Sequence, residues 1–159
     1  TIMLGDSITE WNPMEKENVI NMGIAGDTTR DIFWRIENVK SIEAEKVILM
    51  AGVNDIFMGF PLEKTCDFYK KIISSLRESF QEIILLAVLP TEEERVNVKI
   101  DQMNRCIEGL AKENSLMFFD FSKIFFDNDN SLDSSFYADG VHLSSKGYEA
   151  LNKEIISIL

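Results

Sequence analysis

Five short apolar runs, separated by stretches with helical periodicity, dominate this chain. The runs cover residues 1–4, 19–22, 47–51, 83–89 and 116–121. Short runs of aliphatic and aromatic residues between turn residues are typical of strands that are buried on both faces of a parallel sheet. Their alternation with helices predicts a doubly wound α/β sandwich with about five parallel strands.

The stretches between the runs repeat apolar residues at steps of three and four, which predicts amphipathic helices packed against the sheet. One stripe consists of Leu62, Cys66, Tyr69, Ile73, Leu76 and Phe80, and another of Val96, Ile100, Met103, Ile107 and Leu110. We expect two further helices. One runs from residue 28 or 29 to residue 39, capped by Asp27 or Thr28, and the other runs from residue 144 or 145 to about residue 158.

The length and composition favour one globular domain that spans residues 1–159. The chain is 45% apolar and 27% charged, which is ordinary for a soluble protein. A formal charge of −11 argues against a nucleic-acid partner, because phosphate backbones attract basic surfaces. No apolar run approaches the roughly 20 residues of a membrane-spanning helix, so we expect no membrane insertion. A homo-oligomer is compatible with these totals.

The two cysteines, Cys66 and Cys106, fall on the apolar faces of two predicted helices. Their separation matches no zinc-ligand spacing, so we expect small buried side chains, with a disulfide as the minor alternative. Low cysteine content favours a cytoplasmic location. Secretion is the alternative, since the first predicted strand is expected to be truncated at Thr1, which leaves room for a removed signal peptide.

Four polar motifs follow predicted strands or precede the last predicted helix. They are Gly-Asp-Ser at residues 5–7, the segment 21–27, Gly-Val-Asn-Asp at residues 52–55 and Asp-Gly-Val-His at residues 139–142. Ligands of open parallel sheets bind beyond the carboxyl ends of the strands, so we expect the four motifs to share one rim. Asp6 and Asp55 are assigned to bracing the loops of this rim.

Ser7 and His142 are the central pair of the chemical hypothesis. A serine hydroxyl needs a base to become a nucleophile, and His142 is the only imidazole in the chain. Asp139 is expected to orient the ring through its other nitrogen, although an acid at this position can instead cap the last helix. The amides of Ser7 and Gly26 and the side-chain amide of Asn54 are the expected donors to a tetrahedral oxyanion.

Together the motifs resemble those of the GDSL/SGNH hydrolase superfamily. The matching segments are Gly5-Asp6-Ser7-Ile8-Thr9, Gly23-Ile24-Ala25-Gly26-Asp27, Gly52-Val53-Asn54-Asp55 and Asp139-Gly140-Val141-His142-Leu143. The resemblance implies a three-layer α/β/α sandwich with a flavodoxin-like sheet, a Ser7 nucleophile, a triad completed by Asp139 and His142, and an oxyanion hole that includes Gly26 and Asn54. It implies no metal and no organic cofactor. Residues 21–29 and 137–144 are most similar to the platelet-activating-factor acetylhydrolase and sugar O-acetylesterase branch.

The expected activity is removal of a short acyl group, acetyl first, from a small alcohol or sugar. No long insertion supplies a lid of the kind that interfacial lipases use. Trp11, Phe57 and Phe60 are the candidates for a substrate pocket. An acyl-CoA thioesterase or a lysophospholipase with the same triad is the alternative. Two other classes of protein are disfavoured. A nucleotide-binding module would need a glycine-rich phosphate loop, and none follows any predicted strand. An inactive glycan-binding relative would not need every catalytic residue type, and all of them are present.

Overall fold

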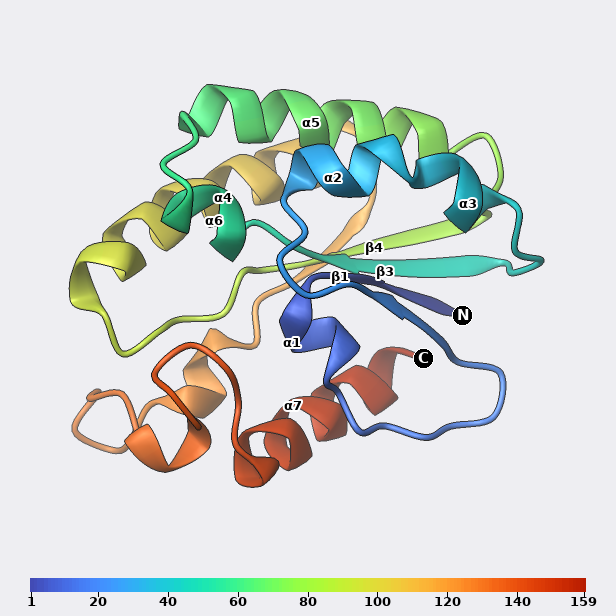
Figure 1. Ribbon diagram of the computed structural model, residues 1–159. Helices are drawn as coiled ribbons and strands as arrows, with labels where there is room; N and C mark the ends of the chain where they lie inside the picture. The colour runs from blue at the N-terminus through green and yellow to red at the C-terminus, as the bar shows by residue number, and fades with distance from the viewer.

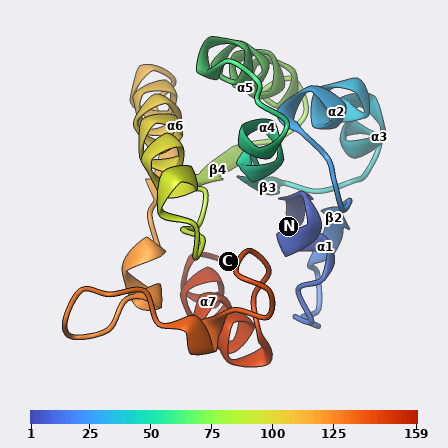
Figure 2. The same cartoon turned by 60° about the vertical axis from the view of Figure 1, so that its left-hand side comes forward.

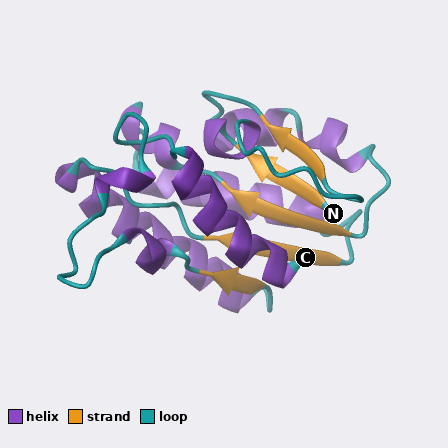
Figure 3. Ribbon diagram, turned by 90° about the horizontal axis from the view of Figure 1, so that it is seen from below, coloured by secondary structure: helices purple, strands orange, loops and turns teal.

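The computed structural model describes residues 1–159 and contains one parallel sheet of five strands (Figure 1). The strands are β1 (Ile2–Gly5), β2 (Ile20–Gly23), β3 (Lys46–Met50), β4 (Glu82–Leu86) and β5 (Met117–Phe119), in the spatial order β2-β1-β3-β4-β5. Every neighbouring pair is parallel, and Figure 3 shows all five arrows pointing the same way. This order is that of a flavodoxin-like doubly wound sheet, which confirms the predicted fold class.

Helices cover both faces of the sheet (Figure 1). They are α1 (Ser7–Glu10), α2 (Thr29–Trp34), α3 (Ile36–Lys40), α4 (Val53–Phe57), α5 (Leu62–Leu76), α6 (Glu94–Glu113) and α7 (Ser145–Ile158), with short 3-10 helices η1 (Ser122–Phe125) and η2 (Ser134–Phe136). Helices α2, α3, α5 and α6 lie on one face, and α1 and α7 lie on the other. None of these helices has both the length and the apolar character needed to cross a membrane.

The central strands send alternate side chains into two separate cores. In β1, Ile2 and Leu4 join the core under α2, α3, α5 and α6, whereas Met3 joins the core under α1 and α7. The prediction of burial on both faces is wrong for the edge strand β2, where Ile20 is exposed. It is also wrong for Met117 at the start of the other edge strand, β5. An edge strand has a neighbour on one side only, so its side chains are covered less completely.

The single helix expected to end at residue 39 is two helices. Thr28 caps α2 as predicted, in a capping box with Asp31. The helix is interrupted at Arg35, whose backbone angles are −101° and 12°, and α3 then continues the chain. The interruption coincides with a guanidinium group that turns toward the ends of β1 and β2.

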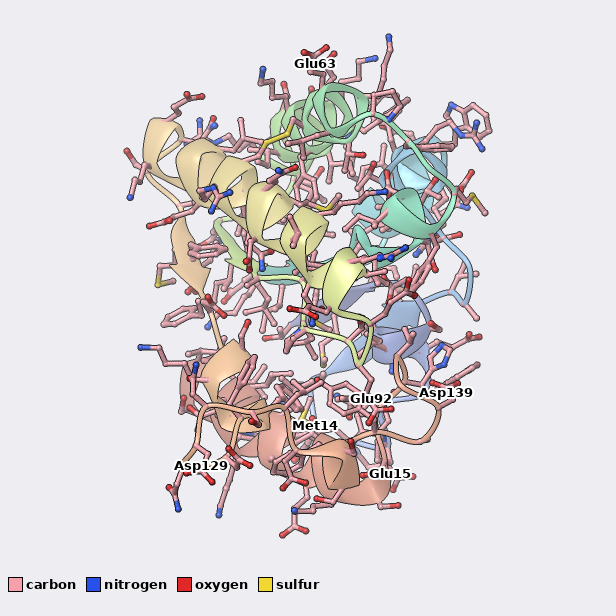
Figure 4. The ribbon with its side chains drawn as sticks, turned by 90° about the vertical axis from the view of Figure 1, so that its left-hand side faces the viewer. Met14, Glu15, Glu63, Glu92, Asp129 and Asp139 are labelled. Carbon is pink, nitrogen blue, oxygen red and sulfur yellow. A yellow bond between two sulfur atoms is a disulfide. The ribbon has the colours of Figure 1, made fainter.

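The expectation of two unbonded cysteines is wrong. Cys66 of α5 and Cys106 of α6 form a disulfide, seen as a yellow bond between the two helices in Figure 4. Both residues are half-buried. Helices α5 and α6 pack side by side, and their apolar stripes bring two cysteines that are 40 residues apart within bonding distance.

Candidate active site

The serine that follows β1 lies in a tight turn into α1. Asp6 caps this short helix, since its Oδ1 accepts a hydrogen bond from the Ile8 amide at 3.0 Å. Gly5 is required at the end of the strand, because a Cβ there would lie 2.2 Å from Thr9 Oγ1. Ser7 is the first helical residue, so its amide has no partner within the helix, and it donates to no other protein atom. The turn therefore leaves both the hydroxyl and the amide of Ser7 available.

The single imidazole of the chain meets this serine. Ser7 Oγ lies 2.9 Å from His142 Nε2, and His142 Nδ1 lies 2.7 Å from Asp139 Oδ2. Figure 2 shows the segment before α7 reaching toward α1, which brings the two ends of the chain together. A carboxylate only accepts hydrogen bonds, so the neutral ring carries its proton on Nδ1 and Nε2 accepts from the serine hydroxyl. The three side chains form one hydrogen-bonded series.

Asp139 is fixed by its own loop as well as by the ring. Its Oδ1 accepts hydrogen bonds from the backbone amides of His142 at 2.8 Å and Val141 at 3.1 Å. Partial burial acts to raise the pKa of Asp139, but the hydrogen bonds from these two residues outweigh it and lower the pKa to about 2. The carboxylate is thus ionised over the physiological range. Ser144 caps α7, so the alternative in which Asp139 caps the last helix is wrong.

The loop after β2 leaves one backbone amide without a partner. The Ile24 amide donates to the last carbonyl of β1 at 3.1 Å, and the Ala25 amide donates to Glu10 Oε2 at 2.7 Å. The Asp27 amide donates back to the Ile24 carbonyl at 3.1 Å. The Gly26 amide between them donates to no protein acceptor. Gly26 has a φ of 86°, which favours glycine, and a Cβ there would meet no atom within 4 Å.

Asn54 presents a side-chain amide beside the same loop. It lies in the first turn of α4, directly beyond β3, and its Nδ2 donates to the Asp27 carbonyl at 3.0 Å. This bond uses one of the two amide hydrogens and leaves the other free. Gly52 has a φ of 130°, and a Cβ there would lie 2.3 Å from Met103 Sδ. The turn into α4 therefore requires glycine and fixes where Asn54 emerges.

Two buried carboxyl groups lie behind the rim. Asp55 is fully buried and accepts hydrogen bonds from the Thr29 amide at 2.9 Å, the Thr29 hydroxyl at 2.6 Å and the Thr65 hydroxyl at 3.1 Å. Burial raises the pKa of Asp55, although these hydrogen bonds act to lower it. Burial also raises the pKa of Asp6 to about 7, against the opposing effects of its backbone hydrogen bond and of His142. The contacts of both residues agree with the bracing role expected from sequence.

The three candidates for the substrate pocket have different surroundings. The Trp11 ring centroid lies 4.3 Å from that of His142, and Trp11 is 51% exposed, so its ring forms a wall beside the imidazole. Phe57 is exposed at the end of α4. Phe60 lines a cavity of about 170 Å³ to which neither Ser7 nor His142 contributes. The assignment of Phe57 and Phe60 to a substrate pocket stays a prediction.

Contacts between loops hold this rim together, and sequence reasoning did not single out the residues that make them. Glu10 reaches from α1 to the Ala25 amide. Arg35 bonds Asp27, the last carbonyl of β1 and the Met22 carbonyl. On the far side of the rim, the Glu92 amide donates to the Gly140 carbonyl at 2.7 Å. Figure 4 labels Glu92 and Asp139, which lie near each other. For Arg35 the available signal was a charge on the otherwise apolar face of a predicted helix.

A hydroxyl, an imidazole and a carboxylate form one hydrogen-bonded series at the carboxyl edge of a doubly wound sheet, and these are the groups that a hydrolase with a serine nucleophile requires. The chain belongs to the GDSL-like lipase/acylhydrolase family, whose model matches residues 3–150.

The relatives of this chain come from more than one kind of protein. An N-acylneuraminate cytidylyltransferase from Escherichia coli is 29% identical over 175 residues, and the match covers 99% of this chain but 39% of that protein. The platelet-activating factor acetylhydrolase IB subunit alpha2 of Homo sapiens is 24% identical over 175 residues, covering 99% of this chain and 75% of that subunit. A GDSL-like lipase from Bacteroides thetaiotaomicron has the same fold, with a TM-score of 0.85 at 24% identity over 99% of this chain and 88% of that one.

Proposed function

We propose that this chain hydrolyses carboxylic esters through an acyl intermediate on Ser7. The observation that carries the proposal is the hydrogen-bonded series from the Ser7 hydroxyl through His142 to Asp139. Two further features support it: amides without protein partners lie in the adjoining loops, and the family to which the chain belongs is one of lipases and acylhydrolases.

The proposal assigns roles in the reaction to Ser7, His142, Asp139, Gly26 and Asn54. His142 Nε2 takes the proton of the Ser7 hydroxyl as Oγ attacks the carbonyl carbon, and ionised Asp139 stabilises the imidazolium through Nδ1. The oxyanion accepts hydrogen bonds from the Ser7 and Gly26 amides and from Asn54 Nδ2. Collapse of the tetrahedral intermediate releases the alcohol, which receives its proton from His142. Water then cleaves the acyl-enzyme by the same route. One such oxyanion donor is worth about 100- to 1000-fold in rate.

A short acyl group on a small alcohol or sugar is the substrate class that we favour. Neither Ser7 nor His142 lines any of the four cavities of the structure, so an acyl chain would lie on an open rim beside Trp11. A long alkyl chain would gain little burial there, whereas acetyl needs little. The names of the relatives support this class, since one removes acetyl groups and another acts on an N-acylneuraminate, a sugar acid.

A substrate panel with matched variants tests the proposal. It contains p-nitrophenyl esters from acetate to dodecanoate, acetylated sugars including an O-acetylated N-acylneuraminate, acyl-CoA thioesters and lysolipids. Ser7→Ala and His142→Ala should each lower kcat by roughly 10⁴-fold or more while the circular dichroism spectrum is unchanged. Near-normal turnover by the Ser7 variant would end the case for an acyl-enzyme. Activity that rises steadily from acetate to dodecanoate would overturn the short-acyl assignment alone.

A further inference from the structure

Arg35 occupies an unusual position for a charged side chain. It stands at the interruption between α2 and α3, and its side chain is 13% exposed. Its Nε lies 2.6 Å from Asp27 Oδ2, and its Nη2 donates to the Met22 carbonyl at 2.9 Å and to the Gly5 carbonyl at 3.2 Å. One guanidinium group therefore joins the carboxyl ends of two neighbouring strands to the loop that follows β2.

Two of the three partners of Arg35 lie within two residues of a group assigned to the reaction. Gly5 precedes Ser7 by two residues, and Asp27 directly follows Gly26. Asp27 also accepts, on its carbonyl, the hydrogen bond from Asn54 Nδ2. Asp27 is thus the point at which the Gly26 loop, the Asn54 side chain and the guanidinium meet.

We propose that Arg35 is a positioning residue that sets the Gly26 and Asn54 amides at their distance from Ser7. This inference rests on the proposed ester hydrolysis and adds a determinant of its rate. Arg35 touches no reacting atom and acts through Asp27 and the strand ends. A shift of about 1 Å in such a group can cost about 100-fold in rate, so loss of the guanidinium should be felt in catalysis.

The geometry requires arginine in particular. A guanidinium presents donors in a fixed plane, so it can hold a carboxylate and two carbonyls at once. A lysine ammonium is a single centre on a flexible stem and can retain only part of this set. The Arg35 Nη1 is buried without a protein acceptor, so the contacts of Nε and Nη2 are made at the cost of one unsatisfied donor.

Two variants and one matched control separate positioning from stability. Arg35→Met removes all the contacts, and Arg35→Lys retains the charge. Val39→Ala, one turn further along in α3, weakens the core at a fully buried position away from the rim. With the best ester of the panel, we expect kcat to fall about 100-fold in the methionine variant and about 10-fold in the lysine variant, with KM within about threefold of wild type. Val39→Ala should lower the melting temperature and keep kcat.

Hydrogen exchange provides a readout that needs no turnover. Peptides that cover residues 22–28 should exchange faster in Arg35→Met than in Val39→Ala at matched stability, whereas those that cover residues 139–143 should not change. If Arg35→Met keeps kcat within threefold while Ser7→Ala is inactive, the positioning role is wrong and ester hydrolysis stands. If the wild type cleaves no ester, the proposed function is wrong, and unchanged exchange at residues 22–28 would overturn the role of Arg35 as well.

Discussion

The buried carboxyl of Asp6 should make the folded protein less stable as the pH rises. This direction is uncommon for an acid, because most carboxyl groups in folded proteins have a lowered pKa and stabilise the fold as the pH rises. Asp6 is 2% exposed, and its pKa is raised from 3.8 to about 7. Burial is the largest cause, because it disfavours the charged form, and the charges of Asp55 and Asp27 add to it. The hydrogen bond from the Ile8 amide and the charge of His142 oppose the shift without cancelling it.

The sign of the effect follows from proton counting. Between pH 3.8 and about pH 7, the folded protein keeps a proton on Asp6 that the unfolded chain has lost. The free energy of unfolding therefore falls as the pH rises through this window, by about 1.4 kcal/mol per pH unit. Above the window, the full cost of ionising the buried group is on the order of 4 kcal/mol.

Asp6→Asn tests this cost directly. The amide oxygen can still accept from the Ile8 amide at the start of α1, while the charge is gone. Between pH 5 and pH 8, urea denaturation should show that the wild type loses about 2 to 3 kcal/mol relative to Asp6→Asn. Asp129→Asn, in an exposed loop, is the matched control and should follow the wild type. Parallel curves of unfolding free energy against pH for wild type and Asp6→Asn would refute the reasoning.

Other contacts lead to equally direct measurements. Asp139→Asn should lower kcat by about 10³- to 10⁴-fold while the circular dichroism spectrum is unchanged, because a neutral amide cannot stabilise the imidazolium; full activity would contradict its role. Asp55→Ala strands three hydrogen-bond donors and should lower the free energy of unfolding by about 3 to 5 kcal/mol in chemical denaturation, with a smaller loss in Asp55→Asn. Reduction of the bond between Cys66 and Cys106 should cost about 2 to 4 kcal/mol, and uptake of an alkylating label by the unreduced protein would show that the bond is absent.

The sheet could be predicted from sequence because its signal is local. Each predicted run overlaps one observed strand. In the central strands β1, β3 and β4, residues buried on both faces must be apolar at successive positions. The meeting of Ser7 and His142 could be predicted for a related reason: parallel strands place their following loops on one rim, whatever the distance along the chain. The strand ends shifted by a residue or more because backbone pairing, not side-chain type, decides where a ladder stops.

Contacts made by long side chains across loops could not be predicted in the same way. The role of Arg35 depends on where two carbonyls and one carboxylate point, and no spacing in the chain encodes those directions. The disulfide depends on how far α5 slides along α6, because one helical turn would separate Cys66 from Cys106. The position of Trp11 against His142 likewise arises from the fold of α1 and not from its own periodicity.

Two carboxyl groups, those of Asp6 and Asp139, interact electrostatically with His142, but one is buried and the other is exposed. This difference decides which of them can stabilise the imidazolium. The Asp139 side chain is 55% exposed, accepts three hydrogen bonds and has a pKa of about 2, so it is ionised at neutral pH. Asp6 is buried with a pKa of about 7, so a large share of molecules carry it in the neutral form at that pH. Because a neutral carboxyl exerts little pull on the ring, the imidazolium is stabilised from the Nδ1 side and Nε2 stays directed at Ser7. At about pH 6, where Asp6 is mostly neutral, Asp6→Asn should therefore keep kcat within about tenfold of wild type where Asp139→Asn loses it, and the reverse order would exchange the two roles.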